Sequence, residues 1–286
     1  MEAGKTTWWQ RIVRAGKVLF WLALILIVVQ QSCAPYLLNT ARTAALTHFQ
    51  DERKSRVIVM IHRAETVSFL GVPVSSYIDI EDSEAVLRAI RLTPAEQPID
   101  LILHTPGGLV LAAEQIATAL SEHKGKVTVF VPHYAMSGGT LIALAASEIV
   151  MDPNAVLGPV DPQIAGMPAG SIVNLLQVKK PNQISDEMLI LIDVAAKARL
   201  EVASFVLEIL QKRLPKEKAA SLAAAFTEGS VTHDFPLTVN LLRKTGLTIS
   251  TAMPRTVYDI MDLYPQSGAG RPSVLYVPMR PTPAAK

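Results

Sequence analysis

Several features that often reveal a function are absent from this chain. It has one cysteine in 286 residues, so it has no intrachain disulfide and no cysteine-based zinc site. The net charge is only +2, and no basic patch with interleaved aromatic residues is present, which argues against a nucleic-acid partner. The phosphate-binding pattern GxxxxGK[ST] is also missing. We therefore expect no metal, no cofactor, no nucleotide and no nucleic acid.

Charged residues are scarce as well, at 18% of the chain, and the N-terminus accounts for much of this. Residues 1–17 contain several basic residues, and the apolar run VLFWLALILIVV follows at 18–29. No charge appears from Val18 to Ala41, which is long enough to cross a bilayer. The alternative is a cleaved signal peptide, because the strongly apolar part is short. We favour a signal anchor at 18–38, with the N-terminus in the cytoplasm and the large domain extracytoplasmic.

The rest of the chain alternates between two kinds of hydrophobic pattern. Short β-branched or aliphatic runs, typical of strands, alternate with segments of helical periodicity. The expected strands are 56–63, 99–105 and 126–133, and the expected helices are 83–93, 109–123 and 140–146. Such alternation predicts an α/β fold with a mostly parallel sheet.

The same patterns set the expected domain boundaries. A polar connector is expected at 39–55, one α/β domain at 56–250, and a C-terminal extension at 251–286. Within the domain, a long helix is expected from Asp186 to Leu214, because no glycine or proline interrupts it. The last twenty residues are rich in proline and are expected to form a mobile tail.

Two glycine-bearing turns contain the residues that suggest a catalytic site. HTPGG (104–108) follows one predicted strand and opens a helix, and MSGG (136–139) does the same one unit later. In a parallel sheet both turns lie at the carboxyl edge, where ligands bind. Ser137 is then a candidate nucleophile, with backbone N–H groups of the glycines nearby to stabilise an oxyanion. The simpler interpretation is that Ser137 is a helix N-cap.

The two turns, together with the run AMSGGTLIALAASEIVMDPNAVLGPVDPQ, resemble the Clp-type and signal-peptide-peptidase-A-type serine peptidases. The membrane-anchored subgroup labelled serine dehydrogenase proteinase is the most similar, and the resemblance extends over about residues 55–250, including THDFPLTVNLLRKTGL. It implies a crotonase-like fold of ββα superhelical units, hydrolysis of peptides or membrane-protein fragments, and homo-oligomerisation. By position it makes Ser137 the nucleophile and assigns the oxyanion hole to three glycines, Gly107, Gly108 and Gly138.

The general base is less clear from the sequence. Clp-type enzymes have a histidine about 25 residues after the serine, but GPVDPQ (158–163) stands there. The signal-peptide-peptidase-A type uses a lysine ahead of a long helix, which favours Lys180 here. A lysine acts as a base near neutral pH only when burial lowers its pKa. Lys179, Lys197 and His233 are further candidates.

Two other functions are compatible with this pattern. One is a catalytically silent scaffold or binding module at the membrane, because no base stands at the expected histidine position. The other is an acyl-CoA enzyme of crotonase type, which would need carboxylates beside the oxyanion hole, and the two glycine turns contain none. We favour the membrane-anchored serine endopeptidase.

Overall fold

The computed structural model describes residues 8–62, 67–69, 72–74 and 77–264, without the side chains of residue 11 and residues 25–34 and 67–74. Most of the C-terminal extension, including the tail expected to be mobile, lies outside these residues. The chain divides into two compact units, residues 1–48 and residues 49–286.

The first unit consists of most of helix α1, which runs from Trp8 to Arg53 without a break. Residues 39–53 of the expected polar connector therefore continue this helix. Within the described residues, no helix has the length and apolarity needed to span a bilayer. The anchor expected at 18–38 lies partly outside the described side chains.

The second unit is built around a parallel sheet. In the described residues this sheet has five strands, in the spatial order β1–β4–β5–β7–β12, and all neighbours are parallel. Their bounds are β1 Arg56–Ile61, β4 Ile99–His104, β5 Val127–Val131, β7 Glu148–Met151 and β12 Ile249–Ser250. Every residue of β4 and β5 is buried, as expected for parallel strands covered on both faces.

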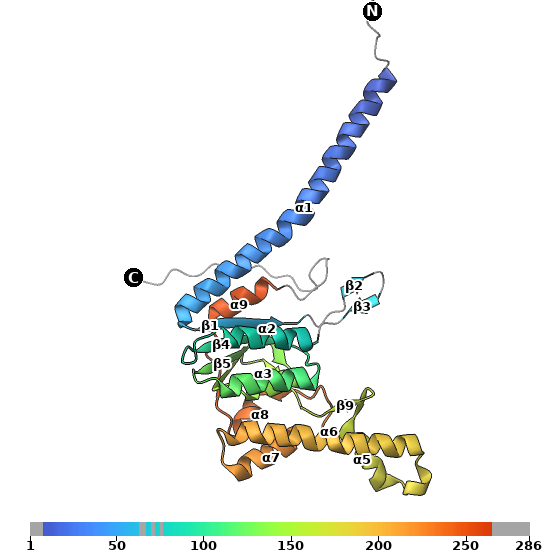
Figure 1. Cartoon of the computed structure of the whole chain (residues 1–286), viewed down its shortest axis with the longest axis vertical. Helices are drawn as coiled ribbons and strands as arrows, with labels where there is room; N and C mark the ends of the chain where they lie inside the picture. The colour runs from blue at the N-terminus through green and yellow to red at the C-terminus, as the bar shows by residue number, and fades with distance from the viewer. Residues whose placement is uncertain (1–7, 63–66, 70–71, 75–76, 265–286) are drawn as a thin grey trace, which may run out of the picture. The chain divides into compact units, whose positions relative to one another are not determined.

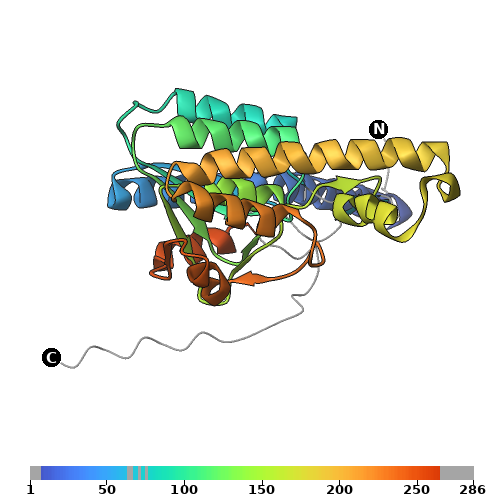
Figure 2. The same cartoon turned by 90° about the horizontal axis from the view of Figure 1, so that it is seen from below.

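Helices flank the sheet (Figure 1). Figure 2 shows α2 and α3 together on one side of it, with α8 and α9 on the opposite side. The helices after α1 are α2 Ile80–Arg91, α3 Val110–Glu122, α4 Gly138–Leu144, α5 Ala169–Val178, α6 Asp186–Gln211, α7 Lys216–Thr227, α8 Val239–Lys244 and α9 Arg255–Asp262. The expected strands and helices of the α/β domain are thus present.

The short strands arrange the loops above the carboxyl edge. Strands β6, β8 and β11 form a second, small sheet in which β8 is central, and β9 and β2 begin two-stranded hairpins. Their bounds are β2 Val67–Phe69, β3 Val72–Val74, β6 Tyr134–Ala135, β8 Val156–Leu157, β9 Gln163–Ile164, β10 Met167–Pro168 and β11 Leu237–Thr238. Because β11 pairs with β8, the chain near residue 233 returns to the segment that follows Leu157.

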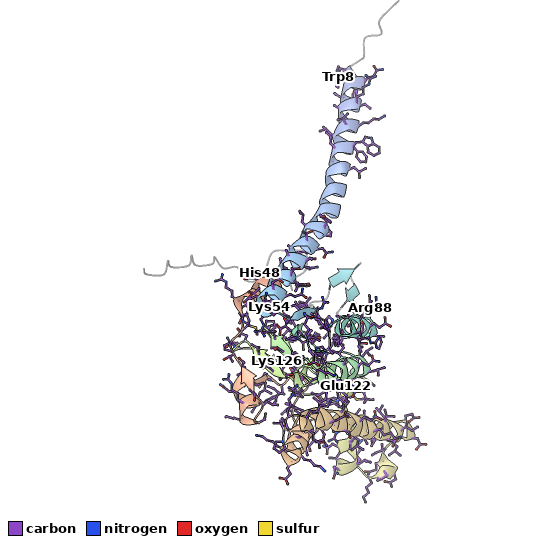
Figure 3. The ribbon with its side chains drawn as sticks, turned by 60° about the vertical axis from the view of Figure 1, so that its left-hand side comes forward. Trp8, His48, Lys54, Arg88, Glu122 and Lys126 are labelled. Atoms are coloured by element: carbon purple, nitrogen blue, oxygen red, sulfur yellow. The ribbon has the colours of Figure 1, made fainter. Side chains whose placement is uncertain are left out.

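The hydrophobic core lies between the sheet and the helices packed on it. Helix α3 inserts Ala113, Ile116 and Ala117, none of which is exposed to solvent, and α4 is buried along its whole length. Charged side chains such as Arg88 and Glu122 lie on the outer surface of their helices (Figure 3). This rigid core holds the two glycine turns next to each other, because β4 and β5 are neighbouring strands.

Helix α5 and the first half of α6 form an arm that extends beyond the sheet (Figure 1). The arm has a small core of its own, made of Ala169, Ile172, Ile192 and Ala195. A one-turn 3₁₀ helix at Pro181–Gln183 connects its two helices. The expected long helix is present, and begins at Asp186 because the side chain of Ser185 accepts a hydrogen bond from the N–H of Met188.

Candidate active site

Ser137 lies on a strained turn between β6 and α4. Its backbone has φ +51° and ψ −116°, a conformation that is costly for a residue with a side chain. Such strain, at a strand-to-helix turn, is the geometry of a nucleophile elbow. The hydroxyl makes no capping hydrogen bond to α4, so the simpler interpretation of Ser137 as a side-chain N-cap does not describe this turn.

The HTPGG turn packs directly against this serine. Gly107 has φ +107°, and a Cβ atom built on it would stand 2.8 Å from the Cβ of Ser137. A side chain at this position would therefore separate the two turns. Gly107 is the residue that lets the oxyanion turn approach the nucleophile.

The three glycines expected to form the oxyanion hole differ in what their N–H groups do. The N–H of Gly107 donates to the hydroxyl of Thr105, with a distance of 3.2 Å. Gly108 and Gly138 are close together, since a Cβ on Gly138 would lie 3.7 Å from the nitrogen of Gly108. Among the described backbone groups, neither of these two N–H groups has an acceptor. Two N–H donors beside the serine are suited to stabilise an oxyanion.

The tight contact at Gly107 makes a first testable prediction. We expect Gly107→Ala to lower kcat/KM more than about 100-fold, because the new methyl group displaces the oxyanion donors from the serine. It should also cost about 1–3 kcal/mol of folding free energy, since an L-residue is strained at this φ. Peptide hydrolysis and thermal unfolding of the purified variant measure both effects.

The matched control is Gly166→Ala. Gly166 also has a positive φ, +75°, but a Cβ there would meet no atom within 4 Å. The control should therefore lose some stability through strain and keep its activity. Full activity in Gly107→Ala would contradict the packing of the two turns.

A histidine and an aspartate from distant parts of the sequence pair beside Ser137. His233 Nδ1 lies 2.7 Å from Asp161 Oδ1, and the Asp161 side chain is fully buried. A carboxylate only accepts hydrogen bonds, so Nδ1 donates and Nε2 keeps its lone pair. Gln163 Nε2 donates to the second oxygen of Asp161, at 2.7 Å. This network holds the imidazole in the orientation and tautomer that a general base needs.

The carboxylate also changes the acidity of the histidine. The hydrogen bond that His233 donates to Asp161 raises the pKa of His233 above its ordinary value, although partial burial of the ring opposes this shift. The charges of Asp161 and Asp234 add smaller contributions in the same upward direction. A raised pKa makes the imidazole a stronger proton acceptor once it is neutral.

Ser137, Gly108, Gly138, Asp161 and His233 all line one cavity of about 240 Å³. Its remaining wall is mainly apolar and comes from several elements. The apolar and aromatic lining residues are Tyr77, Pro106, Val110, Leu141, Val160, Pro162 and Val202. The arrangement therefore combines a strained nucleophile, a histidine and two N–H donors around a pocket for an apolar group.

The lysines expected as bases lie elsewhere. Lys180 is exposed and precedes the 3₁₀ turn at the far end of the arm, next to the first turn of α6. Val202 of α6 lines the cavity sixteen residues after Asp186, which corresponds to about 24 Å along a helix. Lys179 is exposed beside Lys180. The structure does not bring these two lysines to the cavity of Ser137.

Lys197 is also exposed, and its ammonium group pairs with Asp193 one turn earlier in α6. It is not among the residues that line the cavity. Of the four candidate bases, His233 is the one that lines the cavity of Ser137.

The remaining histidines have other surroundings. His123 contacts the carbonyl oxygen of Gln97 at 2.7 Å, far from the glycine turns, and His48 is exposed on α1. His104 and His133 stack with a ring-centroid distance of 5.8 Å. His62 is buried and contacts Thr105, the residue that holds Gly107.

Sequence reasoning found part of this network. His233 was one of the candidate bases, whereas Asp161 stands before a proline, where an aspartate is a common turn residue. Gln163 was missed, and only its position two residues after Asp161 hints at a role. The pairing of β11 with β8, which brings His233 to Asp161, has no local sequence signal.

These features define a hydrolase of the serine class on an α/β sheet. The family model for ClpP-like SDH-type serine proteinases matches residues 9–286, and the chain belongs to this family. The protein is accordingly a serine peptidase with a ClpP-like α/β fold, which bears out the resemblance seen in the sequence.

The chain is also similar to one curated relative and to two solved structures. The protein MJ1495 of Methanocaldococcus jannaschii is 54% identical over 238 residues, which cover 83% of this chain and 81% of the relative. A mutant form of the 1510-N membrane-bound stomatin-specific protease is 20% identical. The matched region covers 64% of this chain and 79% of the protease chain, with a TM-score of 0.43. ClpP1 from Listeria monocytogenes is 19% identical and covers 72% of this chain and 96% of its own, with a TM-score of 0.44.

Proposed function

We propose that this chain is a membrane-anchored serine endopeptidase in which Ser137 is the nucleophile and His233, oriented by Asp161, is the general base. One observation carries the proposal: a serine with positive φ and a histidine bonded to a buried carboxylate line the same cavity. His233 replaces Lys180 as the favoured base because Lys180 is exposed at the distal end of the arm.

The reaction follows from these groups. His233 Nε2 takes the hydroxyl proton as Ser137 Oγ bonds to the carbonyl carbon of the substrate. The negative charge that forms on the carbonyl oxygen is stabilised by the N–H groups of Gly108 and Gly138. The imidazolium then gives its proton to the leaving amine as the C–N bond breaks. Water, deprotonated by the same histidine, hydrolyses the acyl-enzyme and regenerates Ser137.

The cavity lining favours apolar substrates. Its charged side chains, Asp161 and His233, are bonded to each other and so do not select a charged partner. The wall formed by Val110, Leu141 and Val202 matches an aliphatic or aromatic side chain. We propose that peptides or fragments of membrane proteins, which are rich in such residues, are the substrates.

A peptide cleavage assay tests this function. We expect the purified full-length protein to cleave peptides after leucine or phenylalanine at least about 10-fold faster than after lysine or aspartate, because a buried charge has no partner in the cavity. A fluorophosphonate should label the protein and stop this cleavage. A protein that neither cleaves nor labels would instead be a binding module or scaffold on a peptidase fold.

The membrane anchor and the topology rest on the sequence. Basic residues in 1–17 precede the uncharged segment from Val18 to Ala41, which favours an N-terminus in the cytoplasm and an extracytoplasmic catalytic domain. A periplasmic-type reporter fused after Lys286 should therefore be active, and the protein should resist extraction from membranes by carbonate. Activity of a cytoplasmic reporter alone at the same position would contradict this topology.

We also propose that the protein acts as a homo-oligomer. The arm exposes large apolar side chains, including Val178 and Ile190, each more than 60% exposed. Clustered apolar exposure of this kind is typical of interaction surfaces. A second copy of the chain is the partner that this proposal assigns to the arm.

A further inference from the structure

A chain of polar contacts, buried except at Asp82, connects helix α2 to the oxyanion turn. Asp82 Oδ2 lies 3.2 Å from His62 Nε2, and His62 Nδ1 lies 2.8 Å from the hydroxyl oxygen of Thr105. That hydroxyl accepts the N–H of Gly107 at 3.2 Å. His62 and Thr105 are both buried, with Thr105 fully inaccessible. None of these three side chains lines the cavity of Ser137.

The proton positions along this chain are determined by its ends. The carboxylate of Asp82 faces His62 Nε2 as an ion-pair partner, so the neutral tautomer that fits this contact has its proton on Nε2 and leaves Nδ1 as an acceptor. His62 Nδ1 then accepts the proton of the Thr105 hydroxyl. The lone pairs of that hydroxyl therefore face Gly107 and accept its N–H. The Thr105 hydroxyl also lies 3.5 Å from the carbonyl oxygen of Gly107, a longer contact than its 2.8 Å to His62 Nδ1.

Both backbone polar groups of Gly107 are hydrogen-bonded. Its N–H is bonded to Thr105, and its carbonyl oxygen accepts the N–H of Ile78 at 2.8 Å. In a trans peptide the N–H of the next residue points opposite to the carbonyl oxygen. The bond to Ile78 therefore directs the N–H of Gly108 away from Ile78. The bond to Thr105 limits rotation of Gly107, which as a glycine has the widest conformational freedom.

Thr105 also touches the nucleophile turn. Its carbonyl oxygen accepts the N–H of Met136 at 3.0 Å, and a Cβ on Gly139 would lie 2.5 Å from its methyl group. The residue thus contacts both turns, and its backbone and methyl group are held by them. Its hydroxyl is the part whose direction depends on His62.

We propose that His62 and Asp82 are positioning residues that orient the Thr105 hydroxyl and, through Gly107, hold the N–H of Gly108 towards the oxyanion. This inference rests on the proposed function, in which Gly108 donates to the oxyanion formed on a substrate of Ser137. The N–H of Gly108 matters most in the transition state, because the negative charge develops only there. The network should therefore affect kcat and leave KM nearly unchanged.

The test compares three variants of the full-length protein. We expect His62→Leu and Thr105→Val to lower kcat about 10- to 100-fold with KM within about twofold of the native value, since misplacing one oxyanion donor has an effect up to that of removing it. His62→Asn should recover much of kcat, because its amide oxygen can accept from Thr105 as Nδ1 does. Affinity for a peptide aldehyde, whose serine adduct carries the oxyanion, should fall in the same proportion as kcat.

A matched control and a double variant separate positioning from folding. His123→Leu removes another partly buried histidine, one bonded to the carbonyl of Gln97, and should keep kcat. If His62 acts through the hydroxyl of Thr105, the kcat of the double variant His62→Leu/Thr105→Val should lie within about twofold of the kcat of Thr105→Val alone. Thermal unfolding of each variant reports its stability. Labelling by a fluorophosphonate reports how much of the protein has an intact site, so a general loss of folded protein would lower labelling and kcat equally.

Two outcomes overturn the inference in distinguishable ways. If Ser137→Ala abolishes hydrolysis while His62→Leu and Thr105→Val keep native kcat and native aldehyde affinity, the network has no positioning role and the proposed function stands. If Ser137→Ala retains hydrolysis, the proposed function fails, and the inference that rests on it fails too. An increase in KM as large as the decrease in kcat would also contradict a role limited to the oxyanion.

Discussion

Replacing Ser137 by alanine should abolish peptide hydrolysis, with kcat falling by about 10⁵- to 10⁶-fold, as expected when the nucleophile of a serine peptidase is removed. Labelling by a fluorophosphonate should disappear at the same time. The fold should persist, because the hydroxyl makes no capping hydrogen bond and alanine adopts the strained φ of +51° no more easily than serine does. Hydrolysis rates, labelling and circular dichroism of the purified variant measure these three effects.

Ser185→Ala is the matched control for this variant. The Ser185 side chain accepts the N–H of Met188 at the start of α6, away from the cavity. Its loss should cost about 1 kcal/mol of stability and leave activity unchanged. Hydrolysis by Ser137→Ala at the native rate would refute the assignment of the nucleophile.

The second large effect is expected at His233. His233→Ala should reduce kcat by at least about 10³-fold, because the serine hydroxyl then has no base to accept its proton. Lys180→Ala and Lys179→Ala should remain within about twofold of the native rate, since both side chains are exposed at the distal end of the arm. The opposite result, with Lys180→Ala inactive and His233→Ala active, would identify a lysine base and show that the arm approaches Ser137 in the working enzyme.

The pH profile provides an independent test of the same pair. Only the neutral imidazole accepts a proton, so kcat/KM should rise as the pH rises through the pKa of His233. Asp161 raises this pKa, so the acid limb of the native profile should lie above the ordinary histidine range. Asp161→Asn should move the limb to lower pH and reduce the maximal rate, because the amide carries no charge and orients the ring less well. An unchanged limb in Asp161→Asn would contradict the pairing.

The sequence predicted the two glycine turns well, for a local reason. A serine followed by two glycines between a strand and a helix specifies its own backbone geometry within a few residues. The strained φ of Ser137 and the positive φ of Gly107 are properties of such short segments. Neighbouring strands then place the turns together, since β4 and β5 are joined by one helix and lie side by side.

The partners of these turns were harder to predict from the sequence. The N–H of Gly107, expected in the oxyanion hole, is instead bonded to Thr105, because a threonine two residues earlier lies within reach of it. The contact of His62 with Thr105 depends on the register of β1 and β4, in which Ile61 pairs with His104. This register places the residues that follow the two strands next to each other. Local patterns indicate strands but not their register, so neither contact was accessible from the sequence.

The sequence by itself determined the α/β alternation, the glycine-bearing turn at Ser137 and the family, because hydrophobic periodicity and glycine-bearing turns act over a few residues. Only the tertiary structure shows which of the candidate bases lines the cavity of Ser137. His233 lies 96 residues after the serine, and it reaches Asp161 because β11 pairs with β8. The length of α6 separates Lys180 from the cavity, although the sequence places it at the spacing typical of a lysine base. Contacts of this kind depend on how distant segments pack, and that information is spread over the whole core.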